Sequence, residues 1–375
     1  MLYLFIVIFV IYVLLFVLLR LGWENVPEYF SEEAPSSLKV SVIIVARNEE
    51  NNITNLLNGL ENQSYSKSFF EVIIVDDCSE DRTIDKIESF GSGSELKLSV
   101  LKLKNEPTHK QNKKGGIEYA MRYAEGDLII LTDADCTLQK GWISSIVSFY
   151  HQYKPKMIIG PVGYFTDNSF LSYFQALDFL AMQGVSCCSA GLNKPLLCNG
   201  ANIAYEKTLF NELNVYEKDD IASGDDMFML HKAYSSYPDK VKYLKAKSAI
   251  VKTDPCKTWK ALFQQRLRWA GKVKYFDSKE SILVLFFLLV INVLVLVLAF
   301  FSLFETIYLK YFIIAVSTKM LTDIFFLWPV AKFFRQSHML SLFLAVQFVH
   351  FIYMAVVGIL SNILPYSWKG RKIKK

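Results

Sequence analysis

Apolar and polar positions divide this chain into two kinds of sequence. Long apolar runs occur at residues 2–19 and repeatedly from residue 281 onward, whereas residues 39 to about 277 have the mixed composition of an ordinary globular domain. The first run has no charged side chain and is close to the roughly 20 residues that cross a bilayer core. The pattern therefore predicts a globular domain between membrane segments.

The first apolar run predicts an uncleaved membrane anchor at residues 1–22. A secretory signal peptide is the alternative, and it needs a basic start, a shorter apolar core and a small-x-small cleavage site. The run has none of these features. Arg20 and Trp23 suit the membrane interface just beyond it.

Short β-branched runs in the globular region alternate with helical patterns. Four runs are predicted strands, at residues 40–46, 69–75, 96–103 and 128–131. Continuous apolar runs of this length are typical of strands buried on both faces of a parallel sheet. Between the first two strands, apolar residues from Ile53 to Leu60 recur at helical spacing. Strands and helices that alternate in this way predict an α/β fold with a mostly parallel sheet.

Polar clusters directly follow three of these strands, at Arg47–Glu50, Asp76–Ser79 and Asp133–Asp135. Ligands of α/β sheets lie outside the carboxyl ends of the strands, so we expect the clusters to meet there. Asp133 and Asp135 are spaced so that both leave the end of one strand, where a divalent cation can bind together with phosphate oxygens. An acidic, solvated turn is the alternative for this pair.

Three further segments carry candidate chemistry. Asn199-Gly200 indicates a turn among apolar residues. Asp225 and Asp226 begin a predicted helix, and the alternative is that they only compensate the helix dipole. Residues 257–269 are basic and aromatic at helical spacing, which predicts a helix at the membrane surface; simple contact with anionic lipid is the alternative.

Three apolar stretches follow, at residues 281–304, 308–330 and 339–364, and each is long enough to span a bilayer. Lys319 and Asp323 lie four residues apart in the second. Charged residues at such depth are functional candidates, and a self-neutralising ion pair is the alternative. Three full spans would place the basic tail outside, although basic loops favour the cytoplasm. Either one segment is re-entrant or the tail departs from that rule.

Composition narrows the class of protein. The chain has 375 residues, 52% of them hydrophobic, and a formal net charge of +5. Its six cysteines include no C-x-x-C pair, which favours reduced cysteines in a cytosolic domain over a zinc site. The lack of a G-x-G-x-x-G motif and of a P-loop argues against a dehydrogenase or a kinase.

Residues 40–270 resemble the family 2 glycosyltransferases of the GT-A fold. The similarity lies in motifs that occur in the family's order: the strand and turn at 42–50, V-D-D-x-S at 75–79, D-x-D at 133–135, an acidic pair at 224–226 and Q-x-x-R-W at 265–269. The implied fold is an α/β GT-A nucleotide-sugar-binding domain, with a mostly parallel sheet, flanked by transmembrane helices. The expected parts are an anchor at 1–22, this domain at 39–255, an interfacial amphipathic helix at 256–278, membrane helices at 281–364 and a basic tail at 365–375.

The resemblance implies that one group of residues binds a UDP-sugar donor through its base, its sugar or ribose, and its diphosphate. These residues are Asp76, Asp77, Lys113, Asp133 and Arg268. Asp135, with Asp133, would hold the Mn²⁺ or Mg²⁺ ion that bridges the diphosphate. The ion and Lys113 would neutralise the charge that develops on the departing UDP. Lys114 follows Lys113, and which lysine touches phosphate is open.

The resemblance also implies the catalytic and acceptor groups. Asp226 would be the general base that removes a proton from the acceptor hydroxyl, with Asp225 supporting it. Single displacement by that hydroxyl inverts the anomeric centre, so an α-linked donor gives a β-linked product. The expected acceptor-side residues are Asn199, Asn202, Gln265 and Trp269.

The membrane segments resemble those of ceramide glucosyltransferases and polysaccharide synthases. We therefore expect a multi-pass protein of the inner cell membrane with its catalytic domain in the cytoplasm, which transfers a sugar to a lipid or lipid-linked acceptor. A processive synthase that exports a β-linked glycan is the alternative, which the Q-x-x-R-W motif favours and the small number of helices disfavours. A scaffold without catalysis is the third hypothesis. Expected partners are the donor, the lipid or glycan acceptor and membrane lipids, without nucleic acid.

Overall fold

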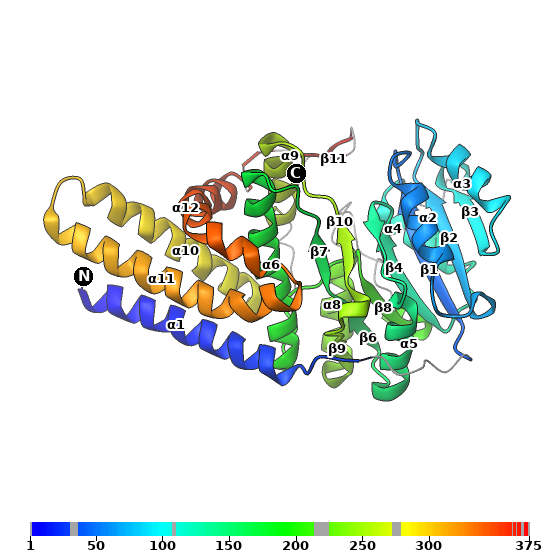
Figure 1. Ribbon diagram of the computed structural model, residues 1–375, viewed down its shortest axis with the longest axis horizontal. Coiled ribbons are helices and arrows are strands. Elements are labelled where there is room, and N and C mark those ends of the chain that lie inside the picture. The colour runs from blue at the N-terminus through cyan, green and yellow to red at the C-terminus, as the bar shows by residue number, and fades with distance from the viewer. Residues whose placement is uncertain are drawn as a thin grey trace. The chain divides into compact units, whose positions relative to one another are not determined.

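The computed structural model describes residues 2–30, 37–106, 110–213, 225–271, 279–361, 363–364, 366–368 and 371–373. Contacts divide the chain into two compact units. The sheet unit comprises Val26–Tyr164 and Asn193–Asp254, and the helical unit comprises Met1–Asn25, Phe165–Leu192 and Pro255–Lys375 (Figure 1).

The sheet unit is built on a seven-stranded sheet in the order β3-β2-β1-β4-β8-β6-β9. Its strands are β1 (Val40–Ala46), β2 (Phe70–Asp76), β3 (Lys97–Lys102), β4 (Leu128–Asp133), β6 (Met157–Ile159), β8 (Ile203–Glu206) and β9 (Val241–Tyr243). The first four are parallel to one another, and β8 pairs antiparallel with both β4 and β6. The predicted α/β fold with a mostly parallel sheet is confirmed.

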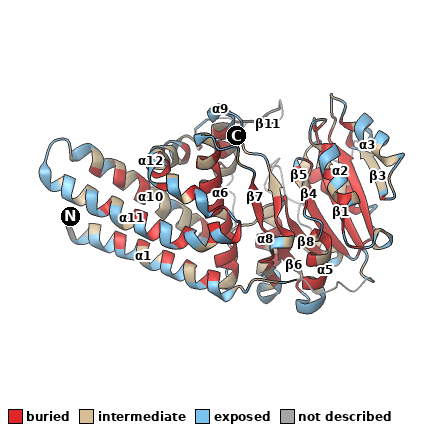
Figure 2. Ribbon diagram, in the orientation of Figure 1, coloured by how far each residue is buried: buried red, intermediate tan, exposed pale blue. Residues whose placement is uncertain are grey.

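Helices cover this sheet and its central strands are buried. The helices of the unit are α2 (Ile53–Glu61), α3 (Thr83–Gly91), α4 (Lys113–Met121), α5 (Trp142–Tyr153), α7 (Lys207–Leu213) and α8 (Asp225–Ser236). Every residue of β2 is buried, and so is every residue of β1 except one. Figure 2 shows these central strands in red. The apolar face predicted between Ile53 and Leu60 is completely buried. The continuous apolar runs form central strands, as expected for strands that are covered on both faces.

A smaller sheet joins distant parts of the same unit. It has the order β5-β10-β7, with β5 at Cys136–Thr137, β7 at Val162–Tyr164 and β10 at Val251–Thr253. Since β5 begins directly after Asp135, its pairing with β10 fixes the chain that leaves the D-x-D turn.

Helix α4 packs unusually close to β1. A Cβ atom added to Gly116 would lie 2.9 Å from both γ carbons of Val45. Val45 is β-branched and pairs with Asp133 in the neighbouring strand, so it has little freedom to move away. Glycine at position 116 therefore allows α4, which begins at Lys113, to approach the end of the strand.

We expect Gly116→Val to destabilise the protein by about 1–3 kcal/mol, the usual cost of overpacking a core. The measurement is the free energy of unfolding, with Gly93→Val as the control, because a Cβ at Gly93 meets nothing within 4 Å. Equal stability of the two variants would contradict the close packing of α4 on β1.

The helical unit contains α1 (Leu2–Asn25), α6 (Phe170–Gly191), α9 (Trp259–Ala270), α10 (Lys279–Phe301), α11 (Thr306–Phe333) and α12 (Phe343–Leu360). Among the described residues, four of its segments are long and apolar enough to cross a membrane: Phe5–Asn25, Lys279–Phe301, Thr306–Phe333 and Ser337–Leu360. These agree in number with the predicted anchor and three later spans. The side chains of the basic tail at 365–375 and all of residues 272–278 lie outside the described residues.

Helix α6 departs from the predicted boundaries. Residues 165–192 fall within the expected 39–255 domain, but their contacts assign them to the helical unit. Two glycines explain the packing: a Cβ on Gly22 of α1 would lie 2.2 Å from the Cys188 carbonyl oxygen, and one on Gly184 would lie 2.8 Å from Phe326 of α11. Glycines at such contacts let apolar helices approach closely.

The charged pair predicted in α11 belongs to a network that links three helices. The Lys319 ammonium lies 2.6 Å from the Asp323 carboxylate, and the Gln347 amide of α12 donates to the same oxygen over 2.7 Å. The hydroxyl of Tyr12 in α1 donates to the other Asp323 oxygen. All four residues are buried. Helix α1 is thus joined to α11 and α12 by polar contacts as well as by apolar packing.

Candidate functional site

The three polar clusters predicted at strand ends lie side by side along one edge of the sheet. The register pairs Ala46 with Asp76 on one side of β1 and Val45 with Asp133 on the other. Neighbouring strands are about 4.8 Å apart, so the ends of β2, β1 and β4 form one continuous edge. Of the residues expected to bind a nucleotide and a cation, this edge of the sheet brings together Asp76, Asp77, Asp133 and Asp135.

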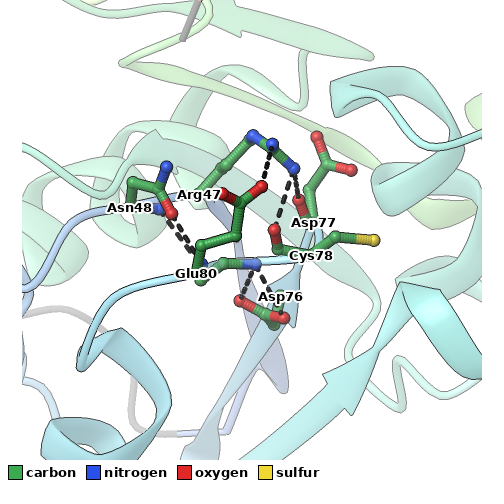
Figure 3. A network of polar contacts seen from close by, with 7 residues as sticks. Arg47, Asn48, Asp76, Asp77, Cys78 and Glu80 are labelled. Carbon is green, nitrogen blue, oxygen red and sulfur yellow. Dashed lines mark hydrogen bonds and ion pairs between the residues drawn. The ribbon is translucent and has the colours of Figure 1, made fainter. Parts of the chain in front are cut away.

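Arg47 organises the turn after β2 (Figure 3). Its buried guanidinium donates to the backbone oxygens of Asp77 and Cys78 over 2.7 and 2.8 Å. It also reaches the Glu80 carboxylate at 3.2 Å. Arg47 was part of a predicted cluster without an assigned role. In the sequence, only its position directly after a buried strand indicated this structural role.

The backbone of the same turn is held in uncommon conformations. Asn48 and Cys78 have positive φ angles of 52° and 58°. Asn48 exchanges two hydrogen bonds with the turn, because its N–H donates to the Ser79 hydroxyl over 3.0 Å and its side-chain oxygen accepts from the Glu80 N–H over 2.8 Å. The turn is thus fixed from both strands before any ligand binds.

Asp76 and Asp77 have different environments. The Asp76 carboxylate accepts the Ser79 N–H over 3.2 and 3.3 Å, so it shapes the turn. The Asp77 N–H donates to the Ala46 carbonyl oxygen over 2.8 Å, which extends the pairing of β1 with β2 by one residue. Figure 3 shows the two carboxylates on opposite sides of the turn. Both residues are buried, Asp76 being 3% and Asp77 0% exposed.

The two adjacent lysines of α4 are separated by their contacts. The Lys113 ammonium lies 2.5 Å from the Asp133 carboxylate at the end of β4. The Lys114 ammonium is buried and lies 4.4 Å from the centroid of the Phe228 ring in α8. Asn112 caps α4 by accepting the Gly115 N–H over 2.9 Å, which fixes the direction in which both lysines leave the helix. Lys113 is the lysine at the strand edge, whereas Lys114 connects α4 to α8.

The D-x-D turn offers oxygen ligands for a hard cation. Asp133 is partly exposed and Asp135 is exposed, one at the end of β4 and the other two residues later. Burial, together with the Asp135 and Asp133 carboxylates, raises the pKa of the Cys136 thiol well above its usual value. Cys136 is therefore a buried, protonated thiol.

The fit to a cation rests on these carboxylates. Within the described part of the chain, no group of three or more His, Cys, Asp and Glu side chains is arranged to hold a metal ion. Mg²⁺ and Mn²⁺ bind to one or two carboxylates when substrate phosphates and water complete the coordination. Asp135, with Asp133 beside it, is a donor set of that kind.

Asp226 lies against the loop that precedes β8. One of its carboxylate oxygens accepts the Gly200 N–H over 3.0 Å and the other accepts the Met227 N–H over 2.9 Å. Strand β8 pairs Ile203 with Leu131 of β4, so this loop begins at the same edge as Asp133. Asp226 and the Asn199 loop are thus brought together. The side chain of Asp225 lies outside the described residues.

Asn202 has a structural task. Its side-chain oxygen accepts the Trp142 indole N–H over 3.0 Å, and its amide donates to the Pro161 and Ala249 carbonyl oxygens, each over 2.9 Å. These three hydrogen bonds occupy both the oxygen and the nitrogen of the amide, and Asn202 is 1% exposed. It therefore supports the loop, and the expected direct contact with an acceptor falls to Asn199, which is partly exposed.

The Q-x-x-R-W motif forms part of α9, as predicted, and α9 belongs to the helical unit. Gln265, Arg268 and Trp269 are all partly exposed. Arg266, which lies inside the motif and was given no role, stacks on Trp269 with 4.1 Å between its guanidinium carbon and the ring centroid.

Family models match most of the chain. The model described as glycosyl transferase family 2 matches residues 41–198, and the one described as glycosyl transferase family group 2 matches residues 128–368. The second match covers more than half of the chain and runs from the D-x-D strand through the last apolar helix.

Individual relatives match the chain at 26–31% identity. The chain is 26% identical over 257 residues to the probable glycosyltransferase YdaM of Bacillus subtilis, covering 67% of this chain and 59% of YdaM. It is 29% identical over 129 residues to the beta-monoglucosyldiacylglycerol synthase of Trichormus variabilis, covering 34% of this chain and 27% of that protein. It is 31% identical over 122 residues to the poly(ribitol-phosphate) beta-N-acetylglucosaminyltransferase TarS of Staphylococcus aureus, covering 32% of this chain and 20% of TarS.

The fold has a solved counterpart. The mannosyltransferase PcManGT of Pyrobaculum calidifontis, solved with GDP-Man and Mn²⁺, aligns over 96% of this chain and 95% of its own with a TM-score of 0.53 and 15% identity. This likeness concerns the fold alone. The chain spans between one fifth and three fifths of the length of these three curated relatives.

Proposed function

Because the chain belongs to the family 2 glycosyl transferases, we propose that it transfers a sugar from a UDP-sugar to a lipid or lipid-linked acceptor at a membrane. The observation that carries this proposal is the shared edge of the sheet, where β2 ends at Asp76, β4 ends at Asp133 and the loop bound to Asp226 leads into β8.

The donor would lie along the ends of β2, β1 and β4. Asp77 binds the base, in a turn that Arg47 and Asn48 hold in place through hydrogen bonds. Lys113 contacts the diphosphate and, through its ion pair, orients Asp133. Since the turn and the lysine are already fixed, little ordering is required when the donor binds, and this favours affinity.

Asp135, with Asp133, would hold Mn²⁺ or Mg²⁺. When bound, the cation stabilises negative charge on the leaving diphosphate. Lys113 contributes a positive charge to the same phosphates, and Arg268 is assigned to them by the family resemblance alone. Negative charge develops on the diphosphate as UDP departs. Positive groups beside the diphosphate would therefore lower the barrier to this step.

Asp226 is the proposed general base. It accepts the proton of the acceptor hydroxyl while that oxygen attacks the anomeric carbon, and the bond from that carbon to the UDP oxygen breaks. Its hydrogen bonds to Gly200 and Met227 hold the carboxylate in one orientation. One displacement without a second nucleophile inverts the anomeric centre and gives a β-linked product.

A lipid acceptor is supported by the four apolar segments and by the glycolipid product named for the Trichormus relative. The apolar helices would place the protein in the inner cell membrane, with the sheet unit in the cytoplasm, where nucleotide sugars are found. Gln265, Trp269 and Asn199 are the proposed acceptor-side residues. Processive synthesis of a β-linked glycan is the second candidate, favoured by the Q-x-x-R-W motif in α9.

The test uses membranes that contain the protein, Mn²⁺ and each of several labelled UDP-sugars. Products are separated by thin-layer chromatography and their anomeric configuration is determined by NMR. A single β-linked glycolipid is the expected result. A polymer would favour the second candidate, and no transfer from any UDP-sugar would overturn the proposal.

We expect Asp135→Ala to weaken metal-dependent binding of UDP by at least about 10-fold. Loss of residues that only support metal ligands already costs about 10–100-fold in affinity, and Asp135 is proposed as a ligand itself. The measurement is UDP affinity by calorimetry with Mn²⁺ and with chelator. Asp239→Ala, at an exposed aspartate of the same unit, is the control. Unchanged UDP affinity in Asp135→Ala would remove its metal role.

A further inference from the structure

Helix α9 is attached to two other helices of its unit by a buried carboxylate. Asp178 of α6 accepts a hydrogen bond from Nε of Arg266 over 2.9 Å, and Nη2 of the same guanidinium lies 2.7 Å from that oxygen as an ion pair. Its other oxygen lies 3.3 Å from Nε2 of His350 in α12. The side chains of Asp178 and Arg266 are only 10% and 6% exposed. Buried ionic groups of this kind must be paired, so the contact is specific.

Arg266 transmits this attachment to the motif residues on either side of it. Its Nη1 donates to the Gln265 side-chain oxygen over 3.1 Å. Its planar guanidinium stacks on the Trp269 ring, which also lies 6.2 Å from the Phe179 ring of α6. The first and last residues of Q-x-x-R-W therefore depend on one arginine, and that arginine depends on Asp178.

Electrostatics maintain the charged state of this cluster. Burial alone would raise the pKa of Asp178, but the Arg266 charge and His350 outweigh it and hold that pKa below its usual value. Asp178 is thus a carboxylate at neutral pH and remains the counter-ion of Arg266. Neutralising it would leave a buried guanidinium without its anionic partner.

We propose that Asp178 and Arg266 are positioning residues that set the orientation of Gln265 and Trp269 toward the sugar acceptor. This inference rests on the proposed function, in which those two side chains meet the acceptor. Arginine is required at position 266, because lysine provides one point charge and cannot at once pair with Asp178, donate to Gln265 and cover the indole ring as the planar guanidinium does. The acceptor step should therefore depend on the shape of residue 266 and not only on its charge.

The decisive variant is Arg266→Lys, which keeps the positive charge near Asp178. We expect kcat/KM for the acceptor to fall about tenfold or more, since small displacements of positioning groups cost up to about 10²-fold. UDP affinity and the KM for the donor should stay near the wild-type values. Asp178→Asn should show the same division between acceptor and donor. Arg122→Lys, at an exposed arginine outside this cluster, is the control.

Each outcome has a separate meaning. Unchanged acceptor kinetics in an active, folded Arg266→Lys variant would overturn this inference while the proposed function stands. Equal losses in the donor and acceptor parameters, or loss of folding in both variants, would assign the cluster to stability alone and overturn it as well. Absence of transfer by the wild-type protein would instead overturn the proposed function, and this inference with it.

Discussion

Asp226→Asn is expected to lower kcat by about 10²–10⁴-fold, the usual contribution of a general base, while the affinity for UDP stays close to that of the wild type. The substitution keeps the size of the side chain and one oxygen that can accept the Gly200 N–H, now 3.0 Å from the carboxylate. It removes the second oxygen and the negative charge that receives the proton. The loop before β8 should therefore keep its position, and only the proton transfer should be lost.

The measurements are single-turnover transfer rates and UDP affinity, both made on purified protein with Mn²⁺. Asp239→Asn is the matched control, because it makes the same chemical change at an exposed position of the sheet unit. Turnover in Asp226→Asn equal to that of the control would remove Asp226 as the base. A parallel loss of UDP affinity would instead assign the carboxylate to support of the donor site.

The strands that carry the site were predictable because each is a continuous apolar run that ends abruptly in polar residues. Residues 40–46 were predicted as a strand and form β1 at Val40–Ala46. Parallel strands end at one edge of a sheet, so the meeting of Asp76 and Asp133 beside β1 followed from the pattern. Local periodicity and the general rule for α/β sheets were sufficient for this part of the fold.

Contacts between residues far apart in sequence were not predictable in this way. The antiparallel pairing of β8 with β4, which brings the loop beside Asp226 to the same edge, has no local signature. The buried amide of Asn202 has the same composition as an exposed one, and only its partner Trp142, 60 residues away, shows its task. The choice between Lys113 and Lys114 depended likewise on Asp133 and on a ring in α8.

The helices that pack against α6 were not predictable from the sequence. Helix α6 ends at Gly191 and approaches α1 closely at Gly22 and α11 closely at Gly184. A helical pattern reveals which face is apolar and does not reveal which helices cover it. For the same reason, the sequence showed Lys319 and Asp323 as a pair within one helix, while Tyr12 and Gln347 of the network come from two others.

The network around Asp323 leads to the largest expected change in stability. Asp323→Ala leaves the Lys319 ammonium, which is 3% exposed, without its counter-ion, and it removes the acceptor of Tyr12 and Gln347. Removing one member of a buried ion pair costs about 3–5 kcal/mol, because a charge remains in a medium that solvates it poorly. We therefore expect unfolding in mixed detergent micelles to begin at a clearly lower fraction of SDS.

The double variant Lys319→Met/Asp323→Leu separates charge from packing. It removes both charges with side chains of similar size, and such replacements are often neutral or stabilising. We expect it to unfold near the wild-type SDS fraction, as should Leu321→Ala, at a position on the same helix that is 71% exposed. If the double variant were as unstable as Asp323→Ala, the hydrogen bonds of Tyr12 and Gln347 to Asp323 would be the main contribution, since apolar side chains cannot replace them. If Asp323→Ala unfolded at the same SDS fraction as Leu321→Ala, the network would have no part in holding α1 against α11 and α12. Apolar packing at Gly22 and Gly184 would then be sufficient.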